Sequence, residues 1–563
     1  MNVNVIPYES ANPRTSNRAG DGALYLVLLV LVWGLTVPAR GLFQDDTLLL
    51  RLARGFQDQG LAALFTPVVS PVRRLYSLPF SFALATASPV LTLHLMFGLV
   101  WFGQALAAGW ITRLLLPAQR RTRFLAICLT LTATSDYLTD NLTALGYNIA
   151  ALAFLLAVGC ALCYQERLRL RWLGLSCAAL TISIWTLDVA IPALPFVPLV
   201  LLWRGGLRSW RRLLLVLLAW GLSLAPAARL EWLFLHDPSG YASVAVHSMP
   251  VAERVLRTAS LWGENFAPWR WAFARPVWYS LPPAVIPIWV SGVAAALGAA
   301  WFALRLKRTD PEDPAPGFAR TGLLIGGLAI MALAANAAYA NVQMAEVHYR
   351  THILSRIWAS LAVAILVGAA ARRWPRGAAG FLLVPTLFVG FGVWGGMERQ
   401  DLLISTWRLH QKELMSIVTN APAVTPGTGI ILRSAAPMER YLATAADYLT
   451  QSWLILLYDD PAIHGLRLAP DRGTGCRAAA DALECWHENQ ADCFAAGTCP
   501  ADRFPYDSLV VMDFDARQGT YRLLADPYGD PLFAGMGAPS YRPEQRILKR
   551  HLTPRQRALL LQQ

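Results

Sequence analysis

Two adjacent carboxylates, Asp45 and Asp46, follow the first membrane-length apolar stretch of the chain, 23–42. A carboxylate at the end of a membrane-spanning helix needs water, a polar neighbour, a metal ion or a substrate beside it. The pair therefore predicts a reaction site at the membrane surface, with Asp45 as a general base or as the ligand of a divalent cation. Alternatively, one of them caps a helix that begins near Thr47, because Asp is a favoured N-cap residue. Asp46 has the better position for a cap, so Asp45 is the first choice for chemistry and Asp46 supports it.

A second group of candidate residues precedes a later apolar stretch. It consists of His348, Tyr349, Arg350, His352 and Arg356. His348, His352 and Arg356 are spaced four apart, so a helix would place them on one face. Such a stripe fits a phosphate or pyrophosphate, because Arg gives fixed paired donors and His can add a proton. The same side chains could instead reach lipid headgroups, and the two His could bind zinc if a third ligand joined them.

Further polar candidates lie in the breaks between apolar stretches. Arg73, Arg74 and Tyr76 follow Asp45 in the first long break. They could bind a lipid phosphate or an anionic sugar, or they could pair with carboxylates of the same loop. Asp136 and Asp188 lie in two short breaks, and acidic residues at membrane depth are functional candidates by default. Those two could equally cap short helices.

The composition predicts a polytopic α-helical membrane protein. Of 563 residues, 55% are hydrophobic and only 15% are charged, and the mean hydropathy is +0.40. Soluble domains rarely carry so little charge. The net charge of +13 comes with Arg clusters between the apolar stretches, which is typical of cytoplasmic anchoring against membrane lipid. We therefore expect no nucleic-acid partner.

The apolar stretches predict about 11 transmembrane helices. They are 22–42, 89–116, 124–137, 147–164, 172–187, 189–203, 212–230, 282–304, 321–340, 356–371 and 378–396. Arg-rich breaks alternate with breaks that lack Lys and Arg, so the positive-inside rule places the N-terminus in the cytoplasm. An odd number of spans then places the C-terminal region outside, and we expect the inner (plasma) membrane of a bacterium.

The cysteines of the C-terminal region agree with this topology. They are Cys476, Cys485, Cys493 and Cys499. No C-x-x-C spacing is present, so disulfides are favoured over a zinc site, and disulfides persist outside the cytoplasm.

The chain is expected to contain two parts. Residues 1–396 form the transmembrane module, with interfacial helices in the outer loops 43–88 and 231–283, and residues 397–563 form a small extracytoplasmic α/β domain. Within that domain the pattern predicts strands at 429–433 and 508–513, a helix at 445–458, and a hairpin leading into a strand at 520–525.

Several of these segments resemble the GT-C superfamily of membrane glycosyltransferases. Gln44-Asp45-Asp46 after the first span is similar to that superfamily's acidic signature in the first outer loop. A second similarity is to a pattern in which an Arg-bearing loop precedes a Pro break and a His that opens the second span. It is carried by Ser70-Pro71-Val72-Arg73-Arg74-Leu75 and the later Ser88-Pro89-Val90-Leu91-Thr92-Leu93-His94. The resemblance makes His94 a candidate substrate-binding residue. Segments 134–150 and 186–202 resemble the superfamily's later outer turns.

The resemblance implies transfer of a sugar from a polyprenyl-phosphate-linked donor to an envelope glycan, lipid or protein on the outer face, with inversion. Asp45 would act as base on the acceptor or hold a divalent cation (Mg or Mn), with Asp46 in support. His348, Arg350, His352 and Arg356 match no strict motif of the superfamily, so charge and location alone assign them to the departing phosphate.

Two alternatives to an enzyme stay open. One is a non-catalytic scaffold with the same fold, and the other is a flippase or transporter of lipid-linked sugar. A transporter needs polar sites near the membrane midplane, whereas the charges here collect at the outer ends of the spans. The sequence has no Walker loop, no dinucleotide fingerprint and no His-Glu-x-x-His motif, and no inner loop is large enough for a nucleotide-sugar. A donor already in the membrane is therefore expected.

Overall fold

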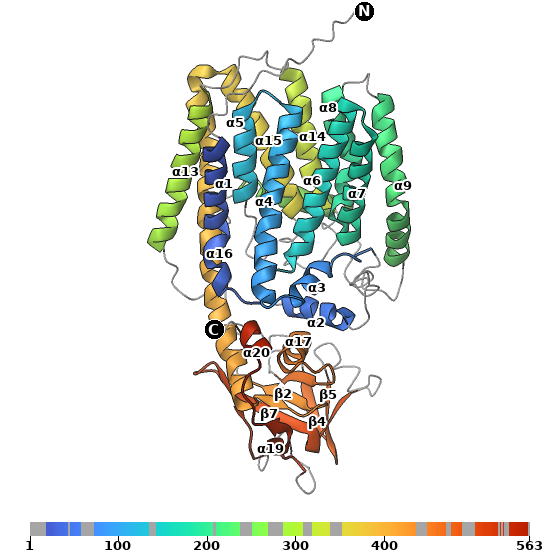
Figure 1. Ribbon diagram of the computed structural model, residues 1–563, viewed down its shortest axis with the longest axis vertical. Helices are drawn as coiled ribbons and strands as arrows, with labels where there is room; N and C mark the ends of the chain where they lie inside the picture. Colours follow the sequence, from blue (N-terminus) through green and yellow to red (C-terminus); the bar gives the residue numbers. More distant parts are fainter. Residues whose placement is uncertain are drawn as a thin grey trace, which may run out of the picture.

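The fold is described from a computed structural model and consists of a helical bundle joined to an α/β domain (Figure 1). The structure describes the chain except residues 1–17, 43–44, 58–71, 134–141, 206–209, 237–249, 268–284, 308–317, 338–351, 435–446, 469–473, 487–500, 527–529, 531–532, 534–539 and 561–563.

A helix occupies each of the eleven predicted apolar stretches. The helices are α1 (Arg18–Val32) with η1 (Gly34–Ala39), α4 (Pro89–Leu115), α5 (Arg120–Thr132), α6 (Ala144–Arg167), α7 (Leu170–Thr186), η4 (Asp188–Phe196) with α8 (Val197–Gly205), α9 (Trp210–Leu235), α13 (Val285–Lys307), α14 (Phe318–Ala337), α15 (His352–Arg373), and α16 (Ala378–Asn420), which follows η7 (Pro375–Gly377). Among the described residues, six helices are long and apolar enough to cross a membrane, namely α4, α6, α9, α13, α15 and α16. The prediction of a multi-pass membrane protein is confirmed, while the count of 11 stays a prediction.

Helix α16 joins the bundle to the C-terminal domain. Its 43 residues make it about 65 Å long, twice the thickness of a bilayer core. The predicted boundary between 396 and 397 falls inside this helix, because the apolar stretch ends there but the helix does not. Trp407, Leu414 and Ile417 are buried on the extension, which packs against the domain's sheet.

The C-terminal domain contains a four-stranded sheet of order β3-β2-β7-β8. Its strands are β2 (Gly429–Arg433), β3 (His464–Leu468), β7 (Leu509–Asp515) and β8 (Thr520–Leu523). Strand β2 pairs in parallel with β3 and β7, and α17 (Asp447–Tyr458) connects β2 to β3. Strands β7 and β8 form the expected hairpin, with Gly519 in the left-handed region at its turn (φ 65°). The strands, helix and hairpin predicted from the sequence all lie where expected, within two residues of β2, β7, β8 and α17.

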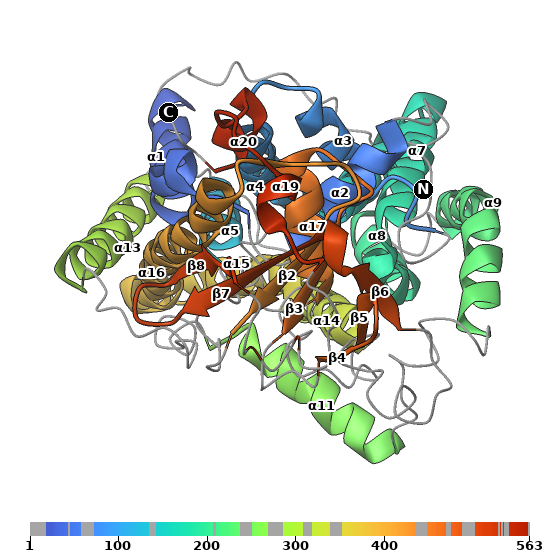
Figure 2. The same ribbon diagram turned by 90° about the horizontal axis from the view of Figure 1, so that it is seen from below.

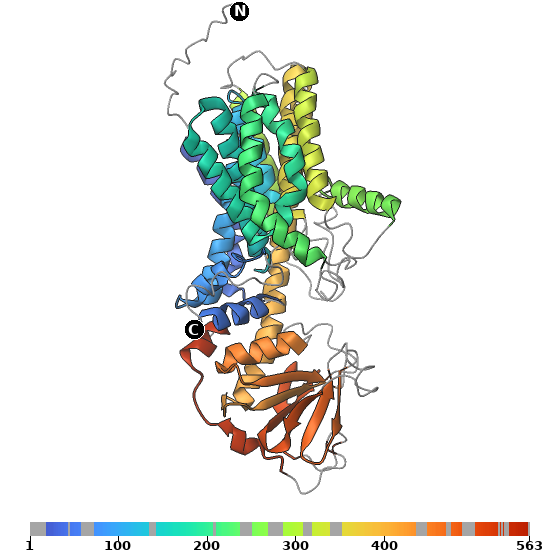
Figure 3. The same cartoon turned by 90° about the vertical axis from the view of Figure 1, so that its right-hand side faces the viewer.

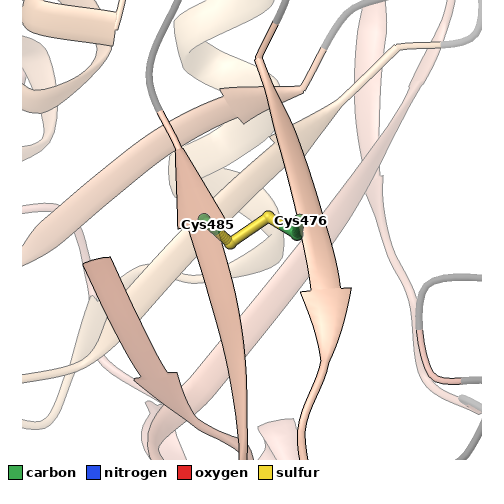
Figure 4. Close-up of a disulfide and its surroundings, with 2 residues drawn as sticks. All are labelled: Cys476 and Cys485. Atoms are coloured by element: carbon green, nitrogen blue, oxygen red, sulfur yellow. A yellow bond between two sulfur atoms is a disulfide. The ribbon is translucent and has the colours of Figure 1, made fainter. Parts of the chain in front are cut away.

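A second, antiparallel sheet carries a disulfide. It has the order β4-β5-β6, with β4 (Gly475–Ala478), β5 (Ala482–Trp486) and β6 (Asp502–Pro505). Cys476 and Cys485 face each other on β4 and β5 and are disulfide-bonded (Figure 4). This confirms a disulfide in the C-terminal region, whereas Cys493 and Cys499 lie outside the described residues.

Short helices fill the junction between bundle and domain. They are α2 (Asp45–Gln57), α3 (Leu78–Leu84) and α20 (Pro554–Leu559). The remaining elements lie elsewhere. They are α11 (Val251–Glu264), η8 (Tyr506–Ser508), α19 (Pro543–Arg546) and the paired strands β1 (Ala423–Val424) and β9 (Ile547–Leu548). Helix α2 lies between the bundle and α17, across the long axis of the molecule (Figures 1 and 3). Helix α11 projects sideways from the bundle (Figure 3).

Candidate functional site

The acidic pair lies at the start of α2, where the first loop meets the bundle. Asp45 is the first residue of the helix, and its side chain lies outside the described part of the structure. Asp46 is fully buried, and its Oδ1 accepts a hydrogen bond of 2.7 Å from the backbone N–H of Thr143. Thr143 directly precedes α6, where backbone N–H groups lack helical partners. Asp46 therefore fastens α2 to the first turn of α6, a contact suited to the supporting role expected of it.

The backbone that leads into this pair is held on two sides at Gly41. The His94 ring lies with Nε2 3.1 Å from the Gly41 carbonyl oxygen, and His94 itself is buried. On the other side lies Trp407 of α16, so close that a Cβ atom on Gly41 would overlap its indole ring. His94 was predicted to bind substrate, and the structure places it against the protein backbone.

Two buried guanidinium groups lie on one aromatic cluster near this backbone. The cluster is formed by Trp33 and by Phe97 and Trp101 of α4, with Trp33 stacked on Phe97 at 4.4 Å and 6.0 Å from Trp101 between ring centroids. Arg40 lies 4.0 Å over the Trp33 ring, and Arg356 of α15 lies 4.9 Å over the Trp101 ring. Both arginines are at most 2% exposed. Cationic groups stacked on aromatic faces away from water interact more strongly than at a surface, and they concentrate positive charge in the cluster.

Arg40 was not predicted from the sequence. It lies within the stretch 22–42 that was assigned to the first span. In the structure its Nε donates to the Thr36 hydroxyl at 2.7 Å and its Nη2 to the Trp33 carbonyl at 2.9 Å, which fixes the guanidinium plane. The signal that could have identified it is the rule that a charge inside an apolar span marks a functional site.

The predicted cationic stripe is described only in part. His352 is the first residue of α15, and Arg356 lies one turn further along the same helix; both are buried. His348 and Arg350 lie outside the described residues. The described half of the stripe therefore points to the bundle interior, as Arg356 shows by its contact with Trp101.

The predicted residues of the first loop contact segments that are distant in sequence. Arg73 Nη2 lies 3.4 Å from Oδ1 of Asp188, at the start of η4, and Arg74 lies 5.2 Å over the Trp185 ring. The Tyr76 hydroxyl donates to the Thr143 carbonyl at 2.6 Å. Arg73 thus pairs with a carboxylate of another break, Asp188. Asp136 lies outside the described residues.

A small cavity lies in the bundle near the end of α5, and none of the predicted site residues that the structure describes lines it. This cavity has a volume of about 20 Å³, roughly that needed by one water molecule. It is lined by Leu129, Thr132, Ala133, Asn265, Ala359, Ser360, Val363 and Phe388. Asn265 is fixed there by a hydrogen bond of 2.8 Å to the Ser355 hydroxyl. The cavity is therefore separate from the aromatic cluster and the acidic pair.

A metal was expected to be possible at Asp45. Within the described ranges, no group of three or more His, Cys, Asp and Glu side chains is placed to hold a metal ion. Asp46 is the carboxylate described at this point, and one of its oxygens is bonded to Thr143. The side chain of Asp45 lies outside the described part of the structure, so no step is assigned to a metal.

Fold and site together define a multi-pass membrane protein with two buried arginines on an aromatic cluster and an acidic pair at the start of α2. No family model matches the chain, and no curated protein matches it. Among solved structures, it is similar to the crystal structure of ArnT from Cupriavidus metallidurans bound to undecaprenyl phosphate, with 13% sequence identity and a TM-score of 0.42. The match covers 80% of this chain and 90% of that one. A likeness of this extent carries no conclusion about what this chain binds.

Proposed function

We propose that the chain is a membrane glycosyltransferase of the GT-C type, which transfers a sugar from a polyprenyl-phosphate-linked donor to an acceptor on the outer face of a bacterial inner membrane. The observation that carries the proposal is the pair of buried guanidinium groups, Arg40 and Arg356, on one aromatic cluster. A phosphate is the ligand that such fixed, planar cations bind best.

Arg40 and the acidic pair are close along the chain, and Arg356 joins Arg40 on the aromatic cluster. Asp45 follows Arg40 by five residues, a length of chain that spans at most about 18 Å. Gly41, within this segment, is held by His94 and Trp407, and Asp46 is held by Thr143. Such an arrangement supplies both groups that sugar transfer needs. The carboxylate can accept the proton of the acceptor, and the two cations can bind the departing phosphate.

The proposed reaction is a direct displacement at the anomeric carbon. Asp45 takes the proton of the acceptor hydroxyl as the acceptor oxygen forms its bond to the anomeric carbon. The bond from that carbon to the phosphate oxygen breaks, its electron pair stays on the phosphate, and the configuration inverts. Charge grows on the phosphate oxygens, where Arg40 and Arg356 stabilise it in surroundings that exclude water. The lipid tail stays in the bilayer beside the spans.

The proposed orientation has the N-terminus in the cytoplasm and the C-terminal domain outside. The disulfide between Cys476 and Cys485 supports it, because disulfides persist in oxidising compartments. An interfacial position of α11 fits the same picture, since Val251, Val255 and Leu256 are more than half exposed on a helix that leaves the bundle sideways (Figure 3).

The proposal is tested by measuring sugar transfer from a panel of polyprenyl-phosphate sugars in lipid nanodiscs. The proteins compared are the purified wild type, Asp45→Asn and Arg40→Gln. Loss of transfer in both variants is the expected result, with unchanged thermal unfolding of Asp45→Asn. Arg40→Gln loses buried hydrogen bonds, so it should unfold at a lower temperature but still purify as a folded protein. Arg373→Gln is the matched control, because this arginine is exposed at the far end of α15. Full transfer by Asp45→Asn would remove the catalytic role.

A scaffold without catalysis is the second candidate. It is favoured by one observation: Asp46 and His94 are both engaged with the protein backbone. Wild type that binds the lipid phosphate but transfers no sugar from any donor would support the scaffold. Donor movement across vesicles without transfer would support a flippase instead.

A further inference from the structure

Trp407 connects three segments that come from different parts of the chain. It lies on the extension of α16, and its ring is against Gly41 in the segment that leads to α2. On the domain side it stacks with Trp453 of α17, with 6.1 Å between ring centroids and 25° between planes. Both indoles are 1% exposed. Trp407 therefore contacts both α17 and the backbone just before the acidic pair, so it links the two.

Helix α2 is also in direct contact with the C-terminal domain. It packs against α17, and Figures 1 and 2 both show the two helices side by side. The buried apolar residues of α2 include Leu49, Leu50 and Ala53, each at most 5% exposed. Burial of such side chains stabilises a helix more than a surface ion pair does.

An ion pair fixes the far end of α2. Arg54, in its last turn, pairs with the Asp459 carboxylate and donates from Nη2 to the Asp459 carbonyl at 3.1 Å. Asp459 directly follows α17 and has a left-handed backbone (φ 61°). The start of α2 is bonded to the bundle through Asp46, and its end to the domain through Arg54, about 12 Å further along the helix.

We infer that the C-terminal domain is a positioning element of the proposed site, with Trp407 and Asp459 as positioning residues that act on Asp45 through α2 and its leading segment. The inference deepens the proposed function and rests on it. Neither residue is proposed to touch substrate. If the contact between α2 and the C-terminal domain loosens, the Asp45 carboxylate leaves its position for transfer and kcat falls. The aromatic cluster that holds the lipid phosphate is not altered, so KM for the donor stays the same.

The test compares Arg54→Gln, Asp459→Asn and Trp407→Phe in the full-length protein. Asn tolerates the left-handed backbone of Asp459, and Phe keeps an aromatic ring, so each variant removes one contact with little other change. Asp481→Asn is the matched control, because Asp481 pairs with Arg503 within the domain. The two readouts are hydrogen exchange of residues 45–57 and the steady-state constants of sugar transfer.

We expect exchange in 45–57 to rise about threefold to fivefold in the ion-pair variants, as the loss of one exposed pair implies, and more in Trp407→Phe. The kcat falls less in the two ion-pair variants than in Trp407→Phe, and KM for the donor stays within a factor of about two in all three. Combining Arg54→Gln with Asp459→Asn adds no further loss to that of Arg54→Gln alone, because Arg54→Gln already removes both the ion pair and the bond to the Asp459 carbonyl.

The outcomes separate this inference from the proposed function. Unchanged exchange in all three variants overturns it, whether or not the wild type transfers sugar. Raised exchange with an unchanged kcat also overturns it, because the contact would then be structural only. If the wild type transfers no sugar at all, the proposed function fails, and raised exchange would still support the physical coupling of α2 to the domain.

Discussion

The guanidinium of Arg356 lies 4.9 Å from the centre of the Trp101 ring, so a charge from α15 is stacked on an aromatic side chain of α4 inside the bundle. The two residues are 255 positions apart in the sequence. The stacking keeps the cation at a fixed depth and orientation, and a planar guanidinium in a fixed orientation is the kind of cation that suits an anion.

Arg356→Lys tests whether this planar geometry matters beyond the charge. Lys keeps the charge but lacks the flat face and the paired donors. We expect a loss of about 2 kcal/mol in transition-state stabilisation, which is a factor of about 30 in the rate of sugar transfer. Titration with polyprenyl phosphate should show weaker binding by Arg356→Lys. Arg373→Lys, at the other end of the same helix, should behave as wild type, and equal activity of both variants would contradict the role of Arg356.

Gly41→Ala tests the close approach of the backbone to Trp407. A methyl group at this position overlaps the indole, so the ring or the backbone must move, at a cost of about 1–3 kcal/mol in the free energy of unfolding. Thermal unfolding of the purified protein measures it. The double variant Gly41→Ala, Trp407→Phe should regain part of the loss, because the smaller ring leaves room.

The control for this substitution is Gly174→Ala. Gly174 lies in α7 with open space where the Cβ would be, and Ala favours a helix. Its stability should be unchanged or slightly higher. A Gly41→Ala protein as stable as wild type would mean that Trp407 does not constrain the segment before α2.

Local sequence patterns predicted the elements, because each follows from neighbouring residues. The apolar stretches place the helices of the bundle, and short apolar runs bounded by turn residues place β2, β7 and β8. The end of α16 was missed for the same reason. The apolar pattern stops at 396, but the helix continues to Asn420 because Trp407 and Leu414 are buried by the domain, a partner that no local window contains.

The site was harder to predict, because its contacts join distant segments. The bond between Asp46 and Thr143 spans 97 positions, and the pairing of Arg73 with Asp188 spans 115. Residue type identified Arg73 and Asp46 as candidates but not their partners. Arg40 was overlooked because an apolar average over the first span conceals one charge.

Asp46→Ala and Asp46→Asn separate the structural role of Asp46 from a chemical one. Ala leaves the buried N–H of Thr143 without this acceptor, which should cost about 1–3 kcal/mol in the free energy of unfolding. Asn retains an oxygen at the same place, so its loss of stability should be smaller and most sugar transfer should persist. Urea unfolding and transfer assays measure the two effects. A stable Asp46→Asn protein without transfer would instead assign chemistry to the Asp46 charge.

The last prediction concerns Arg433 at the carboxyl end of β2. It donates to Asp513 on β7 with Nε and Nη2, at 2.6 and 2.9 Å, and to Asp530 with Nη1 and Nη2, at 2.6 and 2.7 Å. The hydrogen bonds to Asp513 and then to Asp530 raise the pKa of Arg433 above its ordinary value. A raised pKa means that this contribution to stability is fully present below the ordinary value and is lost only as the pH rises through the folded value. We therefore expect no release of the contact at any pH up to about 10.

Arg433→Gln removes the charge and leaves two carboxylates facing each other across the end of the sheet. The domain should lose about 1–3 kcal/mol of stability, since hydrogen bonds to charged partners are lost and like charges meet. Arg433→Lys should recover part of this at pH 7, and the recovered part should decline near pH 10, where Lys begins to lose its proton. Thermal unfolding of the full-length protein at pH 7 and pH 10 measures both effects. If Arg433→Lys kept the same advantage over Arg433→Gln at both pH values, the charge on residue 433 would not be what holds Asp513 and Asp530 together.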